Sequence, residues 1–405
     1  GKLYSVLPES GVGDFTVVRA TEATRVNEAG LIETMGANVP RLDYSGGGCP
    51  VLLTEGQSTN LISYSEDFSD SSWTKSGSSV TSGFTSPDGT TNAFKLVEDT
   101  STGRHETQAA NSSSGDLAFS FFAKKGENSF IQITNGQNPS AYANFDLNLG
   151  VVGSSNVYTP TIIDYGNGWY RCIATINAAS SINYARIGLI TSSTSARVES
   201  YTGDGTSGVY IYGAQLEANA SYSTSYIKTE GSAVTRNADQ VFGAGDASTF
   251  NDSEGVLMAE ISALNDTVSA YNSIGLGSSL VTDRIGLGFQ PNDTIYAYKR
   301  GGSSAYWLPF KTVDITSLNK VALSYNTNDN HFWVNGFKIA SNTTIGDVSN
   351  ITELEFEASY GLEEFYGNTS QVQYFNTALT DSELETLTSW ASFIEMAQAL
   401  NYNII

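Results

Sequence analysis

Short runs of apolar and β-branched residues, separated by clusters of turn residues, recur along most of this chain. Between residues 60 and 239 clear runs are Leu117 to Ala123, Phe130 to Thr134 and Trp169 to Ile176, and turn clusters include Ser86-Pro87-Asp88-Gly89 and Asn167-Gly168. Runs of this length are typical of β-strands, and no helix-length amphipathic period appears in this region. The regular alternation of strands and turns favours a β-sandwich over a βαβ fold.

A second series of strand-like runs extends from about Gly255 to Phe375. Its clearest signal is Asn335-Gly336 between two apolar runs, which predicts a hairpin because both central positions of a type I′ turn need positive φ. Farther on, Thr380-Asp381-Ser382-Glu383 forms a capping box that is followed by apolar residues at helical spacing. We expect a helix from about Asp381 to Leu400.

The length of the chain requires more than one hydrophobic core. Its 405 residues are about two to three times a domain of roughly 150 residues. We expect an all-β fold of two tandem β-sandwich (jelly-roll) domains with an N-terminal β arm and a C-terminal helix. The expected boundaries are residues 1–59 for the arm or attachment segment, 60–240 for the first sandwich, and 241–405 for the second sandwich with its helix.

The charge balance argues against one class of partner. Lys and Arg number 20 against 42 for Asp and Glu, which gives a net charge of −22. Such a chain repels the phosphate backbone and carries no basic stripe, so we expect no nucleic acid partner.

The cysteines limit the possible disulfide bonds, and the hydropathy pattern limits the possible membrane segments. Cys49 and Cys172 are the only two cysteines and have no CxxC spacing, so we favour two buried free thiols, while a single bridge stays open. No run of about 18 apolar residues is present, and the N-terminus lacks a basic region followed by an apolar stretch. We therefore expect neither a membrane span nor a signal peptide.

Several short motifs occur in order along the N-terminal two thirds of the chain. They are RVNEAGLIE from Arg25, VPRLDY from Val39, GCP from Gly48, EGQSTNL from Glu55, YSEDF from Tyr64 with Trp73, GWYR from Gly168, GAQLE from Gly213, and TSYI from Thr224. This ordered set resembles a module common in predicted phage tail fibres and other virion surface proteins. The resemblance implies a place on a phage tail or head, next to other virion proteins.

The stretch from Asn60 to Leu216 also resembles the jelly-roll carbohydrate-binding modules found beside polysaccharide-degrading enzymes. The likeness is carried by Asn60, by Glu66-Asp67-Phe68 and by Trp73. Modules of this family often hold a structural calcium ion near the chain ends, and the resemblance implies Glu66, Asp67 and Glu217 as its ligands. The paired Asp usual in the last strand of that family is replaced here by Gly213-Ala214-Gln215.

The region from Gly255 to Thr388 is similar to the concanavalin A-like or laminin G-like sandwich. The similarity is carried by KVALSY from Lys320, FWVNG from Phe332, and YFNTALTDSEL from Tyr374. It implies a fold and leaves the ligand open, because that family includes lectins, spacers and glycosidases.

The most tempting catalytic motif is Glu353-Leu354-Glu355-Phe356-Glu357, because laminarinase-like hydrolases on this fold carry acidic residues at alternate strand positions. Alternate carboxylates in a straight strand lie roughly 6.6 Å apart and the outer two roughly 13 Å apart. A retaining pair needs about 5 to 5.5 Å. We interpret the motif as an amphipathic strand in which Leu354 and Phe356 face the core and the three glutamates face water.

No other catalytic constellation is evident. His105 and His331 lie in different sandwiches, so we expect them to share neither a triad nor a zinc site. We therefore expect no catalytic residues and a protein that is not an enzyme.

Aromatic residues are the candidates for ligand contact. Saccharides lay their C–H faces on flat rings and pair their hydroxyls with nearby polar groups. The expected ligand-binding residues are Trp73 and Tyr170 in the first sandwich, and Tyr296, Tyr298, Tyr306 and Trp307 in the second. Tyr296 and Tyr298 share one strand face, and Gly301-Gly302 is expected to let the following loop bring Tyr306 and Trp307 over them. Core packing is the alternative interpretation of these rings.

These observations lead to one hypothesis and two alternatives. The leading hypothesis is a non-enzymatic phage virion surface (fibre) protein that recognises host surface glycans and forms a homo-oligomer, with a trimer favoured. The first alternative is a secreted, extracellular bacterial carbohydrate-binding protein associated with polysaccharide degradation. The second is a purely structural virion decoration protein.

Overall fold

The computed structural model describes residues 1–405 except 7–12, 137, 177–180, 267, 269, 278–282, 302–303, 311–312, 344–347, 358–362 and 390–405. Its regular elements are antiparallel strands, and α1 (Asp381–Ser389) is the single helix among the described residues. The prediction of an all-β fold built from β-sandwiches is confirmed. Within the described residues, no helix has both the length and the apolar character needed to cross a membrane.

The chain divides into two compact units. Unit 1 comprises Gly1–Ala20, Ala37–Gly56 and Ala238–Ile405, and unit 2 comprises Thr21–Gly36 and Gln57–Asn237. The two sandwiches expected at 60–240 and 241–405 correspond to the larger parts of these units. The residues expected as a separate arm, 1–59, are instead divided between the two units, because the strands of this segment pair within each of them.

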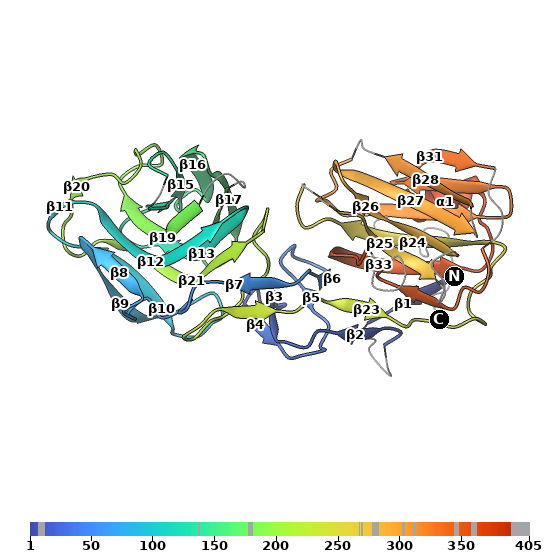
Figure 1. Cartoon of the computed structure of the whole chain (residues 1–405), viewed down its shortest axis with the longest axis horizontal. Helices are drawn as coiled ribbons and strands as arrows, with labels where there is room; N and C mark the ends of the chain where they lie inside the picture. Colours follow the sequence, from blue (N-terminus) through green and yellow to red (C-terminus); the bar gives the residue numbers. More distant parts are fainter. Residues whose placement is uncertain are drawn as a thin grey trace. The chain divides into compact units, whose positions relative to one another are not determined.

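Unit 2 contains two six-stranded sheets in its described part (Figure 1). The first sheet has the order β17 (Thr159–Asp164), β18 (Trp169–Ile176), β13 (Leu117–Lys125), β21 (Gly208–Ala218), β10 (Ala93–Glu98) and β9 (Ser78–Phe84). The second has the order β16 (Val151–Asn156), β15 (Tyr142–Asp146), β14 (Phe130–Thr134), β19 (Ser181–Ile190), β12 (His105–Ser114) and β8 (Trp73–Ser76). Short pairs join β3 (Ala23–Val26) to β4 (Ile32–Met35), β7 (Ser58–Asn60) to β22 (Val234–Arg236), and β11 (Thr102–Gly103) to β20 (Tyr201–Thr202).

The two faces of β13 explain how unit 2 packs. Phe119 and Phe121 are buried between the two sheets, together with Ile131 and Ile187 of the second sheet. Phe122 points to the opposite face because side chains alternate along a strand. There it is buried in a separate cluster that includes Ile32 of the β3–β4 hairpin. This hairpin therefore covers the outer face of the first sheet.

Unit 1 is also a sandwich of two sheets. The larger sheet has the order β31 (Phe337–Asn342), β30 (Asn330–Val334), β29 (Asn319–Tyr325), β24 (Gly255–Ser262), β33 (Gly367–Phe375), β6 (Val51–Thr54) and β5 (Leu42–Asp43), and β1 (Lys2–Tyr4) also pairs with β33. The smaller sheet has the order β28 (Ser304–Phe310), β27 (Thr294–Gly301), β26 (Arg284–Gln290), β25 (Asn272–Gly277) and β32 (Glu353–Glu355). A further pair joins β2 (Thr16–Val18) to β23 (Gln240–Phe242).

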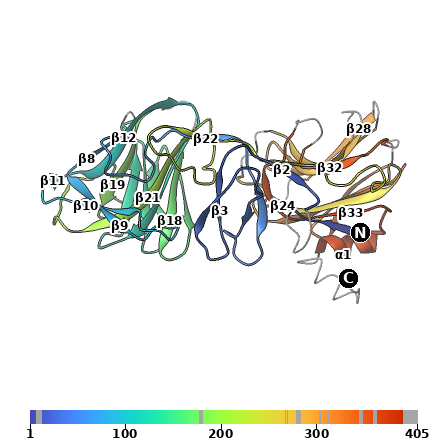
Figure 2. The same cartoon turned by 90° about the horizontal axis from the view of Figure 1, so that it is seen from below.

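Unit 1 has three layers (Figure 2). The main core lies between the two sheets and includes Leu257 and Leu323 from the larger sheet and Ile285 and Leu354 from the smaller one. The helix α1 packs on the outer face of the larger sheet, where Leu384 and Leu387 contact strand residues such as Met258 and Trp333. The outer face of the smaller sheet has no such helix over it among the described residues.

The predicted hairpin and the predicted helix both form. Asn335 and Gly336 have φ of 49° and 84° and join β30 to β31, which confirms the turn prediction. Thr380 caps α1, with its backbone N–H donating to the Glu383 carboxylate at 2.8 Å. The helix is described to Ser389, and the rest of the expected helix lies outside the described residues.

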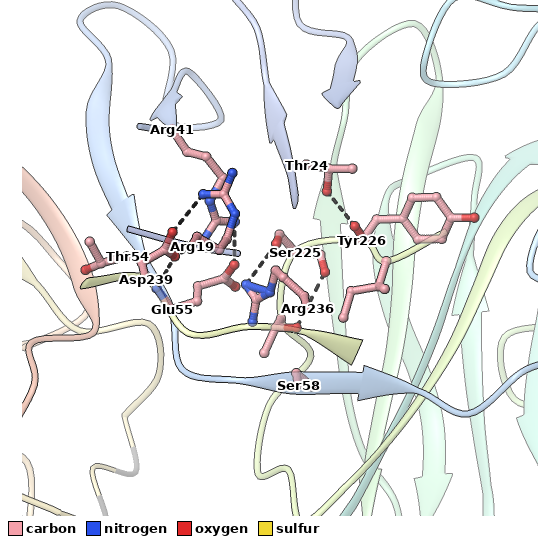
Figure 3. A network of polar contacts seen from close by, with 12 residues as sticks. Arg19, Thr24, Arg41, Thr54, Glu55, Ser58, Ser225, Tyr226, Arg236 and Asp239 are labelled. Carbon is pink, nitrogen blue, oxygen red and sulfur yellow. Dashed lines mark hydrogen bonds and ion pairs between the residues drawn. The ribbon is translucent and has the colours of Figure 1, made fainter. Parts of the chain in front are cut away.

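A buried ionic network joins the three segments that make up unit 1 (Figure 3). Asp239 accepts hydrogen bonds from Arg19 Nη1 at 2.8 Å, from Arg41 Nη2, and from the backbone N–H of Glu55 at 2.9 Å. The Glu55 carboxylate accepts a second bond from Arg41 at 2.6 Å. The four side chains are at most 3% exposed. Burial alone lowers the pKa of Arg41, but the two carboxylates outweigh this effect and the pKa is raised.

Candidate functional site

A cleft of about 500 Å³ opens on unit 2 beside β10. The loop between β7 and β8 lines one side, and the segment after β21 lines another. A backbone bridge between Tyr64 and Glu230 holds these two segments together. The lining residues are Tyr64, Glu66, Asp67, Ser69, Ser82, Asn92, Phe94, Lys228, Thr229 and Glu230. A volume of this size is within the range of small-molecule sites, roughly 300 to 1,000 Å³.

Glu66 is the polar centre of the cleft. Its Oε1 accepts hydrogen bonds from the hydroxyls of Tyr212 at 2.8 Å and Tyr226 at 3.1 Å. Its Oε2 accepts from Asn92 Nδ2 at 3.0 Å and pairs with Lys228 Nζ at 3.2 Å. Burial raises the pKa of Tyr212 and Tyr226, and the nearby carboxylate raises it further, so both phenols keep their protons and donate. This arrangement fixes the amide of Asn92 and the ammonium group of Lys228 at the wall of the cleft.

The charged groups of the cleft are mostly carboxylates. Asp67 is exposed, and Glu230 pairs with Lys228 at 2.6 Å. The half-buried ring of Tyr64 adds an apolar surface. A ligand with several hydroxyl groups fits this chemistry, whereas the excess of carboxylates repels an anion.

The predicted site residues of unit 2 lie in different surroundings. Trp73 is 1% exposed and belongs to the core, and its indole N–H donates to the Tyr64 carbonyl at 2.8 Å, so it lies behind the cleft. Tyr170 is half-buried and packs against the same core. Their contact with a ligand stays a prediction.

The three residues implied as calcium ligands are held by different partners. Glu66 and Asp67 both line the cleft. Glu217 is completely buried, and its carboxylate accepts hydrogen bonds from Ser58 at 2.6 Å and Ser223 at 2.9 Å. Among the described residues, no group of three or more His, Cys, Asp or Glu is arranged to hold a metal ion. Calcium binding at these residues therefore stays a prediction.

The aromatic set of unit 1 is partly brought together. Tyr296 and Tyr298 stack in β27 with ring centroids 5.7 Å apart, and Trp307 lies 4.9 Å from Tyr298. Trp307 reaches them from β28, where it pairs with Tyr298, and not from a loop. Tyr306 pairs with Lys299 and so faces the opposite side of the sheet, which makes the expectation that it lies over the tyrosines wrong. The sequence reasoning missed Tyr271, whose ring lies 5.8 Å from that of Trp307.

The three glutamates of the motif, two in β32 and Glu357 just beyond it, differ in exposure. Leu354 and Phe356 face the core as expected. The expectation that all three glutamates face water is wrong for Glu355, which is 4% exposed. Burial raises the pKa of Glu355 to about 9, and the neighbouring Glu357 and Glu353 raise it as well. The pairing of β32 with β25 in the smaller sheet causes this burial, and the local alternation of residues does not reveal it.

The two cysteines and the two histidines have structural surroundings. Both thiols are free, and Cys172 is buried while Cys49 is exposed, so the expectation of two buried thiols is wrong for Cys49. His105 is buried and its ring nitrogens contact the backbone carbonyls of Gly77 and Tyr201. His331 pairs with two carboxylates of unit 1, among them Asp381 of α1.

No family model and no curated protein sequence matches this chain. Parts of it are similar to solved structures. Domain 4 of the extracellular arabinanase AbnA from Geobacillus stearothermophilus is 17% identical over 37% of this chain and 73% of that domain, with a TM-score of 0.31. The CBM40 of the Ruminococcus gnavus IT-sialidase is 18% identical over 36% of this chain and 87% of its own, with a TM-score of 0.30. Domains LG4-5 of the mouse laminin alpha1 chain are 12% identical over 70% of this chain and 92% of their own, with a TM-score of 0.24. Because these scores are low, we base the function on the residues of this chain alone.

Proposed function

We propose that this chain is a non-enzymatic glycan-binding protein of the phage virion surface, and that the cleft of unit 2 contacts the host saccharide. The observation that supports glycan binding is the combination of the Tyr64 ring with fixed polar groups of Glu66, Asn92 and Lys228 around one cavity. An aromatic ring supplies apolar area for the C–H face of a sugar, and the polar groups pair with its hydroxyls. The carboxylates around the cleft favour neutral or basic saccharides over acidic ones.

The test is a glycan array with the full chain, followed by calorimetric titration of the best binders. Lys228→Ala and Asn92→Ala each remove a polar group of the cleft, and we expect either change to weaken binding about tenfold. Lys125→Ala is the matched control, because this exposed lysine of unit 2 bonds to Asn148 outside the cleft. An array without any binder, or equal affinities for the cleft and control variants, would contradict the proposal.

The cleft supports a secreted bacterial carbohydrate-binding protein equally well. Mass spectrometry of purified virions separates the two, because only the phage protein is a stoichiometric virion component. We further propose a homo-oligomer, with a trimer favoured, which light scattering of the purified chain tests directly.

A further inference from the structure

A polar surface lies on the outer face of the second sheet of unit 2. The strand register places Glu106 of β12 opposite Gly188 of β19, which in turn lies opposite Gln132 of β14. The residues that alternate with them, such as Ile131 and Ile187, are buried between the two sheets. The side chains of this row therefore point away from the core. The cleft described above is lined by other residues.

Glu106 is buried on this face beside arginine side chains. Its Oε1 lies 3.0 Å from Nε of Arg104 and 3.4 Å from Nε of Arg186. The side chain of Glu106 is 3% exposed, and this burial raises its pKa although Arg186, Arg104 and Arg197 all lower it. Glu106 therefore supplies at most one negative charge against the three positive charges of these arginines.

Two of the arginines are oriented by neutral partners. Arg186 donates from Nε and Nη2 to Oε1 of Gln108 at 2.9 and 2.7 Å. Arg197 donates from Nε to the carbonyl of Ala141 at 3.1 Å and from Nη2 to the carbonyl of Asn135. These acceptors fix the position of each guanidinium group but do not cancel its charge.

The loop that carries Arg197 is held on the sheet in a strained conformation. Val198 follows it with a φ of 54°, which lies in the left-handed region that β-branched residues rarely adopt. The backbone N–H of Val198 donates to Oε1 of Gln132 at 2.8 Å, and Nδ2 of Asn144 donates to the Ser195 carbonyl at 2.8 Å. Backbone strain persists where the surrounding contacts impose it, and it is concentrated at functional sites. These contacts hold Arg197 on the outer face of the sheet.

The arginines are accessible and repel one another. The side chain of Arg104 is 49% exposed, and Arg197 and Gln108 are half-buried. Burial lowers the pKa of Arg186, and the charges of Arg104 and Arg197 lower it further despite the presence of Glu106. A bound anion would relieve this repulsion. The net charge of −22 does not prevent its approach, because charges farther away than about 8 Å are largely screened at physiological ionic strength.

We propose that Arg104, Arg186 and Arg197 form a second ligand site on unit 2, which binds the anionic group of an acidic saccharide. A guanidinium group presents paired N–H donors that match two oxygens of a carboxylate or a sulfate. The half-buried ring of Tyr184, 5.8 Å from the guanidinium carbon of Arg186, adds an apolar surface for the sugar ring. The assignment of a saccharide rests on the proposed glycan-binding function, whereas the preference for an anion rests on the arginines alone.

The experiment titrates the full chain by calorimetry with trigalacturonate, its methyl ester, a sulfated carrageenan tetrasaccharide and sodium sulfate. At least one of the two acidic oligosaccharides should bind, and the uncharged ester should bind at least about tenfold more weakly than trigalacturonate. Arg104→Gln should weaken the binding of the acidic sugar about tenfold, whereas Glu106→Gln, which removes the competing carboxylate, should strengthen it. Lys125→Gln is the matched control, because it also removes one positive charge from unit 2 but lies outside this face and bonds to Asn148.

Three results would overturn the site. They are the absence of binding of both acidic oligosaccharides at millimolar concentration, equal effects of Arg104→Gln and Lys125→Gln, and an affinity for sodium sulfate as high as that for the sugars, which would indicate a site for bare anions. Lys228→Ala separates this site from the proposed function, since it alters the cleft and should leave the binding of acidic sugars intact. Binding of a neutral glycan that depends on Lys228 and not on Arg104 supports the cleft even if the arginine site fails.

Discussion

Replacing Asp239 by Asn tests whether the buried ionic network holds the three segments of unit 1 together. The change keeps the shape of the side chain but leaves Arg19 and Arg41 without one of their carboxylates in a site with almost no solvent exposure. Breaking a buried ion pair in this way costs about 3 to 5 kcal/mol, because a charge remains buried without compensation. For a unit of about 200 residues, each kcal/mol lowers the melting temperature by about 2 to 4 °C. We therefore expect a drop of about 6 to 20 °C in the melting of unit 1.

Scanning calorimetry measures the drop, and hydrogen exchange followed peptide by peptide assigns it to a unit. Unit 2 should keep its protection, because all four residues of the network belong to unit 1. Lys2→Ala is the control, since Lys2 pairs with Asp14 at 2.6 Å on the surface, where an ion pair contributes about 0 to 1 kcal/mol. If Asp239→Asn melts at the same temperature as the control, the network does not stabilise unit 1 and the reasoning fails.

Three further predictions concern single groups. Glu355 keeps a proton in the folded state up to a pKa of about 9 but loses it near pH 4.5 when unfolded, so the free energy of unfolding of unit 1 should fall as pH rises through this interval. Glu355→Gln should flatten that dependence in urea titrations at several pH values, and an unchanged slope would refute the assignment. Burial raises the pKa of the Cys172 thiol, while Cys49 is exposed, so a thiol reagent should modify one cysteine per folded chain and two in denaturant; two fast reactions in the folded chain would contradict this burial. Thr380→Ala removes the cap of α1 and should lower the stability of unit 1 by about 1 kcal/mol in chemical denaturation, whereas Thr386→Ala within the exposed helix surface should not; equal effects would argue against the cap.

Local patterns in the sequence predicted local structure well. The runs Phe130 to Thr134 and Trp169 to Ile176 became β14 and β18 with the same bounds, because alternating side chains and flanking turn residues act over a few positions. The hairpin at Asn335-Gly336 formed for the same reason, since positive φ is a property of those two residues.

Features that depend on pairing between distant segments could not be predicted from local sequence patterns. The burial of Glu355 follows from its position opposite Gly275, about 80 residues earlier in the chain. The division of the first 59 residues between the two units depends on pairs such as β6 with β33. The alternation of side chains along a strand would have separated Tyr306 from Trp307, because adjacent residues in a strand face opposite sides of the sheet.

The buried polar groups of unit 1 divide into two kinds, and the division indicates which of them serve the fold. In the Asp239 network, carboxylate oxygens meet guanidinium or backbone donors, so the charges are compensated inside the protein. The hydroxyls of Tyr296 and Tyr298 are neutral, and the hydroxyl of Ser273 lies beside both of them. Burying a neutral hydroxyl costs much less free energy than burying a charge, so these two phenols need no ionic partner. Loss of a carboxylate from the Asp239 network is therefore expected to destabilise unit 1 more than loss of either phenol hydroxyl.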